Sequence, residues 1–394
     1  MINKTDQIKN KNNQGQNFFY LDNKIPRWRE LLGIQITILI TGHTGFKGSW
    51  LSIWLTFLGA KVVGLSDDVP TNPSNFIASK VGELIEDNRI DIRDKKSVEK
   101  IIQQCQPDFV FHMAAQALVR ASYESPLSTI EVNSIGSVNI LEGLRKLNKQ
   151  VIAVMITSDK VYDNVERFSG YRETDRLGGK DPYSASKGMA ELAIRAYVES
   201  FFNMNNNNVR IGIVRAGNVI GGGDWAIDRI VPDCMRAWSN SEIVNIRNPH
   251  ATRPWQHVLE PLSGYLALAI DLKNSSQKHG EAYNFGPSAE QDFNVSVLIN
   301  EMAKYWDKVS WNDTSSSENH LHEAGLLKLN CDKSFNDLHW QSTLNFEETV
   351  RMTVEWYKAF YQNEHSSMYN YTIAQISEYM KIAKSKNILW ANYD

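Results

Sequence analysis

Five short, continuous apolar runs rich in β-branched residues follow one another along the first half of the chain. They are 36–42 (ITILITG), 61–66 (KVVGLS), 108–115 (DFVFHMAA), 151–158 (VIAVMITS) and 209–217 (VRIGIVRAG). Continuous runs, unlike alternating ones, indicate strands that are covered on both faces, as in a parallel sheet. Helical stretches such as SWLSIWLTFLG, SVEKIIQQC, SVNILEGLRKL and SKGMAELAIRAYVESFF lie between them. The alternation predicts an α/β fold with a doubly wound parallel sheet.

The alternation stops after about Asn218. Three consecutive glycines and several prolines then mark loops around one helical piece, Arg229 to Trp238, and short helices mix with polar linkers beyond it. We expect a smaller, mixed α/β lobe that binds the substrate. The expected division is a polar N-terminal extension (1–32), the sheet domain (33–217, with a return segment near 253–287), the lobe (218–252 and 288–360) and a C-terminal tail (361–394).

The C-terminal tail carries a weak helical face. Its apolar members are Ile373, Ile376, Tyr379 and Ile382. We expect this face to pack on the lobe or on a partner subunit, because apolar residues at helical spacing are buried against another element.

Composition narrows the class of partner. The chain has 394 residues, and 42 Lys and Arg against 45 Asp and Glu give a net charge of −3. This balance argues against a nucleic acid as the binding partner. The chain also has no polybasic run that would bind a membrane surface, and no apolar run that is long enough to span a membrane. The partner is expected to be a small molecule. Three scattered cysteines favour a reducing, cytoplasmic location. His320 and His322 have no third ligand at useful spacing, so no metal is expected.

A glycine-rich turn follows the first strand. LITGHTGFKGSWL places Gly42, Gly45 and Gly48 between that strand and a helix. Glycines there permit a tight turn and close approach of the backbone to a pyrophosphate, and the helix N-terminus donates N–H groups to it. About 20 residues later, Asp67 or Asp68 is placed to bond the ribose hydroxyls and to repel a 2′-phosphate, which favours NAD over NADP. Alternatively, both carboxylates belong to a polar loop before Pro70.

The spacing GxxGxxG after Thr41 resembles the extended short-chain dehydrogenase/reductase family, which has a Rossmann sheet. DIRD at 91–94 and HMAAQ at 112–116 support the resemblance. In that family the first motif lies against adenine, and small residues in the second let the cofactor pass over the third strand. The cofactor-binding residues implied are Gly42, Thr44, Gly45, Phe46, Lys47, Gly48, Asp67, Asp91, Ile92, Ala114, Ala115, Gln116, Tyr183 and Lys187.

Tyr183 and Lys187 in YSASK are four residues apart on a predicted helix, which places the phenol and the ammonium on one face. A neighbouring cation favours the phenolate, so we expect the pKa of Tyr183 to be lowered. Ser158 ends a strand, where ligands of open α/β sheets bind, and can hydrogen-bond an alcohol that is being oxidised. Together the three residues predict oxidation of a secondary alcohol by NAD. A YxxxK match by itself is weak, because most such pairs are helix surface.

Asp159 and Lys160 follow Ser158 directly. Such a pair can be an ordinary surface ion pair. If a hexose C4 hydroxyl becomes a ketone, however, loss of water across C5 and C6 needs an acid for the C6 hydroxyl and a base for C5–H. We assign the acid to Asp159 and the base to Lys160, which must then be neutral; His43 and Lys47 are possible cationic neighbours. A charged Lys160 would instead stabilise the enolate and leave C5–H to another group.

The chain resembles the nucleotide-sugar 4,6-dehydratases, which usually have Asp-Glu at this place. Asp-Lys, together with GHTGFKGSW, AAQxLVRxSY and RAGNVIGGGDW, is similar to the CDP-glucose 4,6-dehydratase branch, and the likeness spans about 33–357. This resemblance implies CDP-glucose as substrate, CDP-4-dehydro-6-deoxyglucose as product, and a place in deoxysugar and lipopolysaccharide O-antigen biosynthesis. The substrate-binding residues expected are His43, Arg120, Asn218, Arg229 and Arg253, the last three at the nucleotide part.

Two polar residues are expected to be structural. His112 is interpreted as a packed residue at a strand end, and Asn133 as a link between helix and strand.

Three other functions stay open. These are a dehydratase of another nucleotide sugar, a nucleotide-hexose 4-epimerase, and a non-catalytic NAD-sensing regulator. The resemblance also implies a homodimer or homotetramer, and the helical stretches 137–147 and 186–202 could supply the contact between subunits.

Overall fold

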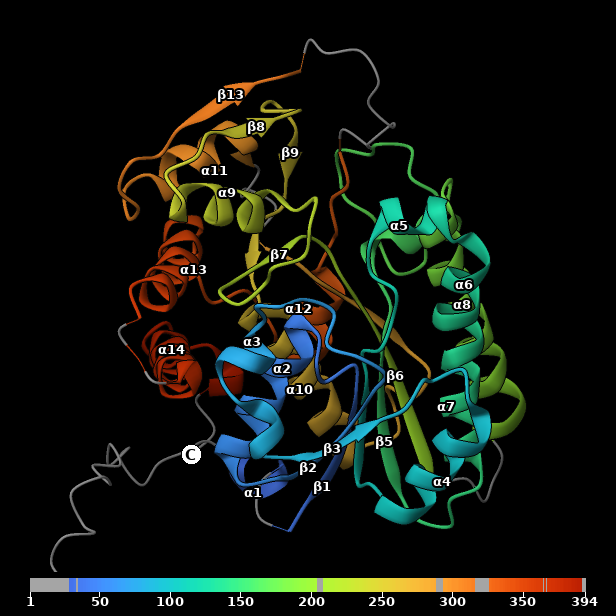
Figure 1. Cartoon of the computed structure of the whole chain (residues 1–394). Helices are drawn as coiled ribbons and strands as arrows, with labels where there is room; N and C mark the ends of the chain where they lie inside the picture. The colour runs from blue at the N-terminus through green and yellow to red at the C-terminus, as the bar shows by residue number, and fades with distance from the viewer. Residues whose placement is uncertain are drawn as a thin grey trace, which may run out of the picture.

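A parallel sheet forms the centre of the molecule (Figure 1). The computed structural model describes residues 28–32, 35–203, 208–287, 293–315, 326–363, 365 and 367–391. Almost all of the expected N-terminal extension, and both His320 and His322, lie outside these ranges. The sheet has seven strands in the order β11-β6-β5-β4-β1-β2-β3, and every neighbouring pair is parallel. The strands are β1 (Thr37–Thr41), β2 (Lys61–Ser66), β3 (Glu86–Arg89), β4 (Phe109–His112), β5 (Val151–Ile156), β6 (Val209–Ala216) and β11 (Ala282–Phe285).

Helices cover both faces of the sheet, as the continuous apolar runs predict (Figure 1). One face carries α2 (Phe46–Leu58) and α10 (Leu259–Asn274), and the other carries α4 (Lys95–Cys105), α7 (Gly136–Arg145) and α8 (Pro182–Tyr197). In β1, Ile38 and Ile40 belong to one hydrophobic core and Leu39 to the other, because successive side chains point to opposite faces. The predicted doubly wound sheet is therefore confirmed.

Two strands of the sheet were not among the five expected. β3 has the sequence EDNR and lies at the sheet edge, where solvent reaches it, so it has no apolar run to reveal it. β11, with the sequence AYNF, is fully buried but only four residues long. Its place beside β6 comes from the tertiary fold rather than from a local pattern.

Short strands and helices form the lobe above the carboxyl ends of the sheet strands (Figure 1). The expected helical piece at 229–238 is α9 (Ile230–Ser239). Three two-stranded ladders join β7 (Val219–Ile220) to β10 (Gln256–His257), β9 (Thr252–Arg253) to β12 (Phe293–Asn294), and β8 (Val244–Ile246) to β13 (Trp311–Asp313). Helices α11 (Val295–Met302) and α13 (Phe346–Tyr361) complete it. The domain boundaries given above stay a prediction.

The remaining helical segments connect these parts. They are α1 (Trp28–Leu32), α3 (Asn75–Ala78), η1 (Val81–Glu83), α5 (Val119–Glu124), α6 (Pro126–Ile130), η2 (Glu131–Ile135), η3 (Asp159–Val161), η4 (Val198–Phe202), α12 (Asp332–Leu338) and η5 (Leu389–Ala391).

The C-terminal tail forms helix α14 (Met368–Ser385), and the expected apolar face is buried. It packs on the sheet domain through α2 as well as on α13, so the expected contact with the lobe is only part of its docking. The Tyr379 hydroxyl is 2.9 Å from both Glu260 Oε2 and Ser263 Oγ of α10. The tail is thus tied into the core by a buried polar cluster.

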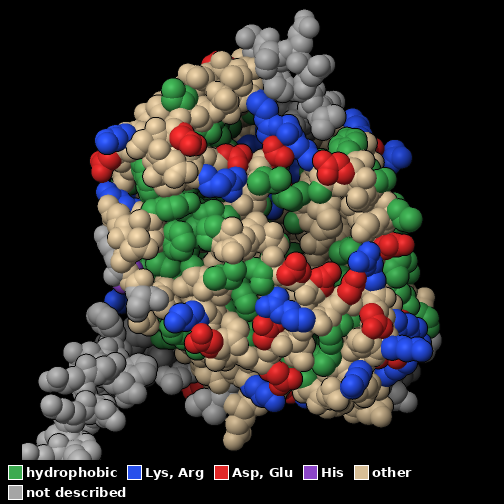
Figure 2. Space-filling view, viewed as in Figure 1, with side chains coloured by type: hydrophobic (Ala, Val, Ile, Leu, Met, Phe, Trp, Pro, Cys, Tyr) green, Lys and Arg blue, Asp and Glu red, His purple; other side chains and the backbone are tan. Residues whose placement is uncertain are grey.

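The surface view agrees with the balanced composition. Figure 2 shows basic and acidic side chains interspersed over one face, without a continuous basic patch on that face. Within the described residues, no helix is both long and apolar enough to cross a membrane. Over the same part of the chain, no three His, Cys, Asp or Glu residues gather as metal ligands.

Candidate active site

The glycine-rich turn between β1 and α2 leaves no room for side chains. Gly42 has φ of +72°, and a Cβ on it would lie 2.7 Å from the backbone N of Ala114. A Cβ on Gly48 would lie 2.1 Å from the carbonyl oxygen of Gly42. The Thr44 hydroxyl is 2.8 Å from Ser66 Oγ and donates to the carbonyl of Asp68 at 2.6 Å, which ties the turn to the end of β2. The turn is therefore compact, with the N-terminus of α2 open above it.

His43 is packed inside the fold. Its side chain is fully buried, packs against Gly64 of β2, and its Nε2 is 2.8 Å from Asp87 Oδ1 of β3. The expected contact of His43 with a substrate stays a prediction. Burial outweighs the neighbouring carboxylate and lowers the pKa of the imidazole. His43 links the glycine turn to the polar edge strand.

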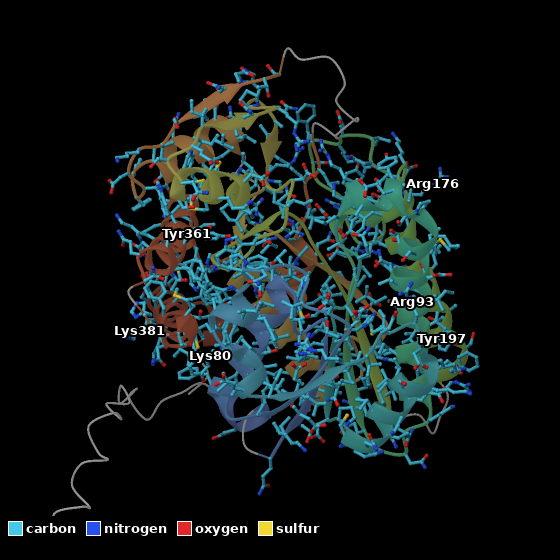
Figure 3. All side chains as sticks on the ribbon, viewed as in Figure 1. Lys80, Arg93, Arg176, Tyr197, Tyr361 and Lys381 are labelled. Carbon is cyan, nitrogen blue, oxygen red and sulfur yellow. The ribbon has the colours of Figure 1, made fainter. Side chains whose placement is uncertain are left out.

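The predicted adenosine site lies beyond the ends of β2 and β3. Asp67 is exposed directly after β2, as a contact with ribose requires. Asp91 is paired with Arg93, whose Nη2 is 2.6 Å from Asp91 Oδ2; Figure 3 shows Arg93 in the α4–α7 half of the molecule. The Ile92 side chain is buried and packs on Gly136, so only its backbone can face an adenine.

Polar side chains hold the segment after β4 in place. Thr41 Oγ1 accepts hydrogen bonds from the backbone N of Met113 and Ala114, both at 3.1 Å, and is 2.8 Å from His112 Nδ1. His112 Nε2 is 2.9 Å from Ser137 Oγ, and burial lowers the pKa of this imidazole to about 3. His112 is therefore a neutral, packed residue at a strand end, as expected.

Gln116 and Asn133 fix the next turn. The Asn133 amide accepts from Gln116 N at 2.8 Å and donates to Gln116 O and to Ser186 Oγ, which confirms its structural role. The Gln116 amide is occupied by Leu118 and Thr129. The backbone and the side chain of Gln116 are thus both held by protein partners, and its contact with a cofactor stays a prediction. Ala114 and Ala115 are both half-buried, and their small side chains take up little space in this segment.

Ser158 and Asp159 form the centre of the site at the carboxyl end of β5. The Ser158 hydroxyl donates to Asp159 Oδ1 at 3.0 Å and accepts from the backbone N of Lys160 at 3.2 Å. Both side chains are buried, and a Cβ on Gly217 would lie 2.7 Å from Asp159 Oδ2. Burial raises the pKa of the Asp159 carboxyl, while Lys160, Ser158 and Lys47 offset part of the rise. A buried carboxyl with a raised pKa is suited to act as an acid.

Tyr183 and Lys187 lie on the buried face of α8, beside this centre. Asp181 caps the helix by accepting from Ser184 N at 2.9 Å, and Tyr183 N donates to Ser122 Oγ. The expected fall in the Tyr183 pKa is not observed: burial raises it to about 12, and Ser158 and Arg229 offset only part of the rise. Burial also lowers the pKa of Lys187 to about 8, with the charge on Lys47 contributing.

Lys47 reaches the same centre from α2. Its Nζ donates to the Tyr265 hydroxyl of α10 at 3.3 Å. Burial lowers the pKa of Lys47 to about 8; the charge on Arg229 lowers it further and that on Asp159 raises it. Lys47 is therefore electrostatically coupled to the carboxyl acid Asp159. Phe46, one residue earlier, packs against the core.

The arginines expected to bind substrate lie in different places. Arg229 pairs with Asp224 at 2.7 Å and interacts electrostatically with both Tyr183 and Lys47; its expected contact with the nucleotide part stays a prediction. Arg120 of α5 pairs with Asp228 at 2.9 Å and so bridges to the lobe.

The other two expected substrate-binding residues, Asn218 and Arg253, lie in the part of the chain that follows β6. Asn218 follows β6, and its carbonyl accepts from Gln256 N at 3.3 Å. Arg253 is half-buried in β9, and its Nη1 donates to the carbonyl of Thr252 at 2.7 Å. Their contacts with a substrate stay a prediction.

A buried ion pair behind the catalytic residues was not predicted. Arg215 of β6 and Glu191 of α8 are fully buried; Arg215 Nε donates to Glu191 Oε2 at 2.9 Å, and Thr157 Oγ1 donates to the same oxygen at 3.2 Å. Glu191 stands four residues after Lys187, so the spacing of Tyr183, Lys187 and Glu191 on one helical face was the signal that could have revealed it. The pair joins α8 to β6, and Thr157 links the same carboxylate to the end of β5, next to Ser158.

Comparison with known proteins places this geometry in a family. The sequence model of the family described as GDP-mannose 4,6 dehydratase matches residues 39–353. A CDP-glucose 4,6-dehydratase from Salmonella typhimurium is 47% identical over 347 residues, which cover 87% of this chain and 96% of that protein. A CDP-paratose 2-epimerase from Salmonella typhi is 24% identical over 345 residues, covering 81% of this chain and 98% of that one.

Solved structures share the fold at lower identity. A UDP-glucuronic acid 4-epimerase from Bacillus cereus, in complex with UDP-glucuronic acid and NAD, superposes with a TM-score of 0.70 at 20% identity and covers 82% of this chain and 100% of that one. A UDP-glucose 4-epimerase from Stenotrophomonas maltophila gives a TM-score of 0.71 at 19% identity. The match covers 83% of this chain and 99% of that one. From the extent of the family match and the 47% identity, the chain belongs to the GDP-mannose 4,6 dehydratase family.

Proposed function

We propose that the protein is an NAD-dependent CDP-glucose 4,6-dehydratase, which converts CDP-glucose to CDP-4-dehydro-6-deoxyglucose and water. The observation that carries the proposal is the buried Asp159 carboxyl, hydrogen-bonded to the Ser158 hydroxyl beside Tyr183. An epimerase needs no such acid. The 47% identity to a relative with this name supports the substrate. Cytoplasmic location and a role in deoxysugar and O-antigen biosynthesis belong to the same proposal.

The residues present fit a dinucleotide. A Cβ on Gly42 or Gly48 would clash with neighbouring backbone, so these glycines permit the tight turn that a pyrophosphate site needs, and the exposed Asp67 stands where a ribose hydroxyl would meet it and a 2′-phosphate would be repelled. Lys187 is placed for the second ribose. When bound, NAD supplies the acceptor for the C4 hydride and returns that hydride to C6.

Tyr183 and Ser158 carry out the first step on the C4 hydroxyl. Ser158 Oγ orients the hydroxyl, and Tyr183 takes its proton. Burial favours the neutral phenol, so the phenolate needs cations close by. Lys187 on the next helical turn and Arg229 across the site supply them.

Asp159 and Lys160 then remove water across C5 and C6. The raised pKa of Asp159 keeps a proton available for the departing C6 hydroxyl. Lys160, half-buried and next in sequence, is assigned to C5–H as base. Lys47 interacts electrostatically with Asp159, so its ammonium helps to balance the carboxylate left after proton transfer.

A nucleotide panel tests the proposed function. The protein is incubated with CDP-, UDP-, dTDP- and GDP-glucose, and the products are identified by mass spectrometry and NMR. We expect loss of one water and a 4-keto-6-deoxy sugar from CDP-glucose in preference to the others. Conversion to CDP-galactose without loss of mass would identify an epimerase instead. No conversion of any of the four sugars, by a chain that still binds NAD, would favour the NAD-sensing regulator.

We also propose that the protein is a homodimer through the outer face of α6, η2 and α8. The residues of α8 that point away from the core include Met189 and Leu192, both exposed, while Tyr183 and Lys187 occupy the opposite face. Leu127 of α6 and Ile135 of η2 are also exposed, and α6 and η2 both pack beside α8. Exposed apolar side chains gathered on neighbouring helices are typical of a subunit contact. Tyr197, labelled in Figure 3, marks the far end of α8 on this side.

Sedimentation velocity tests the dimer. The natural chain should sediment as a dimer, and Leu127→Glu with Leu192→Glu should sediment as a monomer, because two buried charges oppose association. Ile243→Glu, which changes another exposed apolar residue far along the chain, serves as the control and should stay dimeric. A natural chain that sediments as a monomer at micromolar concentration would contradict the proposal.

A further inference from the structure

A small, open pocket lies beyond the carboxyl ends of β6 and β11. Gly217 follows β6 and Gly286 follows β11, and both line the pocket, with Pro254 and Phe168 at other sides. Gly217 is also the residue whose Cβ would lie 2.7 Å from Asp159 Oδ2. The pocket is therefore adjacent to the carboxyl group that acts on the C6 hydroxyl, at the sheet edge where ligands of this fold class bind.

Gln256 lines this pocket and is almost completely buried. Its Nε2 donates to the carbonyl of Phe285 at 3.1 Å, which fixes the orientation of the amide. Among the described residues, no donor reaches its Oε1. A buried acceptor without a donor is costly, and a bound ligand with a hydroxyl can remove that cost.

An unpaired acceptor alone would not identify a site. Gln375 of α14 is similarly buried; its Nε2 donates to the carbonyl of Met352 at 2.7 Å, and its Oε1 also has no donor within the described part of the chain. Gln375, however, is in the packed helix α14 and does not line this pocket. The pocket and its contact with the Asp159 environment distinguish Gln256.

From these observations we infer that Gln256 is a specificity-determining residue whose Oε1 accepts a hydrogen bond from a hydroxyl group of the bound hexose. This inference rests on the proposed function, since it takes the hexose of a nucleotide sugar as the occupant. The donor is assigned to the sugar because the pocket borders Asp159, which acts on the sugar. The 4-amino group of cytosine is the other possible donor on CDP-glucose, and the test separates the two.

Binding to analogues that each lack one hydroxyl tests the inference. Tyr183→Phe stops turnover in the full chain with NAD, and calorimetry gives Kd for CDP-glucose and for its 2-deoxy, 3-deoxy and 6-deoxy analogues. We expect one analogue to bind about tenfold more weakly than CDP-glucose, the size of effect of one lost neutral hydrogen bond. With Gln256→Met added, that analogue and CDP-glucose should bind equally, because the acceptor is gone.

Two further variants keep the result interpretable. Gln256→Glu retains an acceptor and should keep the discrimination, and Gln375→Met, the matched control, should keep it as well. Unchanged ratios for every analogue in Gln256→Met would overturn the inference and leave the dehydratase intact. A loss of preference for CDP-glucose over UDP-glucose instead would show that cytosine is the donor, which also overturns it. If none of the glucose nucleotides binds, both the inference and the proposed function fail.

Discussion

Asp159 illustrates how burial sets the role of a single residue. The sequence places it after Ser158 at a strand end, where an ordinary ion pair with Lys160 was an open alternative. In the structure the carboxyl of Asp159 is buried and accepts a hydrogen bond from the Ser158 hydroxyl, and burial is the main cause of its raised pKa. A surface ion pair would have kept the pKa low.

Substitution of this acid should separate the two halves of the reaction. In Asp159→Asn the amide retains the shape but has no proton to give to the C6 hydroxyl, so overall turnover should fall about 10²- to 10⁴-fold. Oxidation at C4 should still occur, and absorbance at 340 nm from reduced cofactor should accumulate in a single turnover. Ser158→Ala is the comparison, since it should slow the oxidation itself. Full dehydratase turnover by Asp159→Asn would contradict the acid role.

The amines at the site predict a pH dependence. Burial and the charge on Lys47 lower the pKa of Lys187 to about 8, so Lys187 loses its proton as the pH rises through about 8. The support it gives to the Tyr183 phenolate is then lost, and kcat/KM should fall on the alkaline side. Lys47→Met removes a neighbouring positive charge and should move this alkaline limb to higher pH. A limb that stays in place or moves to lower pH would show that the two lysines are not coupled.

One expectation about an individual residue failed because of burial. The pKa of Tyr183 was expected to be lowered, because this residue stands in a motif beside Lys187. The structure buries Tyr183. Desolvation depends on the tertiary surroundings of a side chain, which the spacing of a motif does not contain.

At the scale of elements, the orientation of α8 decides the geometry of the site. Asp181 caps its first turn, and its buried face carries Tyr183, Lys187 and Glu191 in successive turns. The pair between Glu191 and Arg215 fixes this helix to β6, while Thr157 binds the same carboxylate from the end of β5. One buried carboxylate, that of Glu191, thus links α8 both to β6 and to the end of β5, next to Ser158 and Asp159.

Breaking this pair from one side should be costly. Glu191→Leu or Arg215→Met alone leaves one buried charge without its partner and should lower the free energy of unfolding by about 3–5 kcal/mol. The double variant should recover much of that loss, because neither charge remains. Urea unfolding measures both. Glu86→Gln, which removes an exposed pair with Lys61 at 3.8 Å, is the control and should cost less than about 1 kcal/mol. Equal losses in the single and double variants would contradict the coupling.

The elements that the sequence predicted are those with a local signal. The five apolar runs became β1, β2, β4, β5 and β6, and the four helical stretches became α2, α4, α7 and α8. β3 and β11 lacked a signal, because one is polar and the other is very short. The packing of α14 on α2 could not be predicted from the sequence either, because the apolar face of a helix does not indicate which surface will cover it.

For the whole molecule, the site is assembled from both parts of the fold. The glycine turn, Ser158 with Asp159, and Tyr183 with Lys187 come from the sheet domain, and all of them were named from sequence because each belongs to a short motif. Arg229 and Gln256 come from the chain beyond Asn218, where motifs are weaker. Their proximity to the catalytic residues depends on how the lobe sits above the sheet, which only the structure provides.

The most direct measurement follows an isotope through the complete reaction. CDP-glucose carrying deuterium at C4 is incubated with the protein, and the product is analysed by NMR and mass spectrometry. The account predicts loss of water and deuterium at C6 of a 4-keto-6-deoxy product, because the hydride removed from C4 returns to C6 within the same site. Deuterium retained at C4, whether in unchanged sugar or in its C4 epimer, would contradict it.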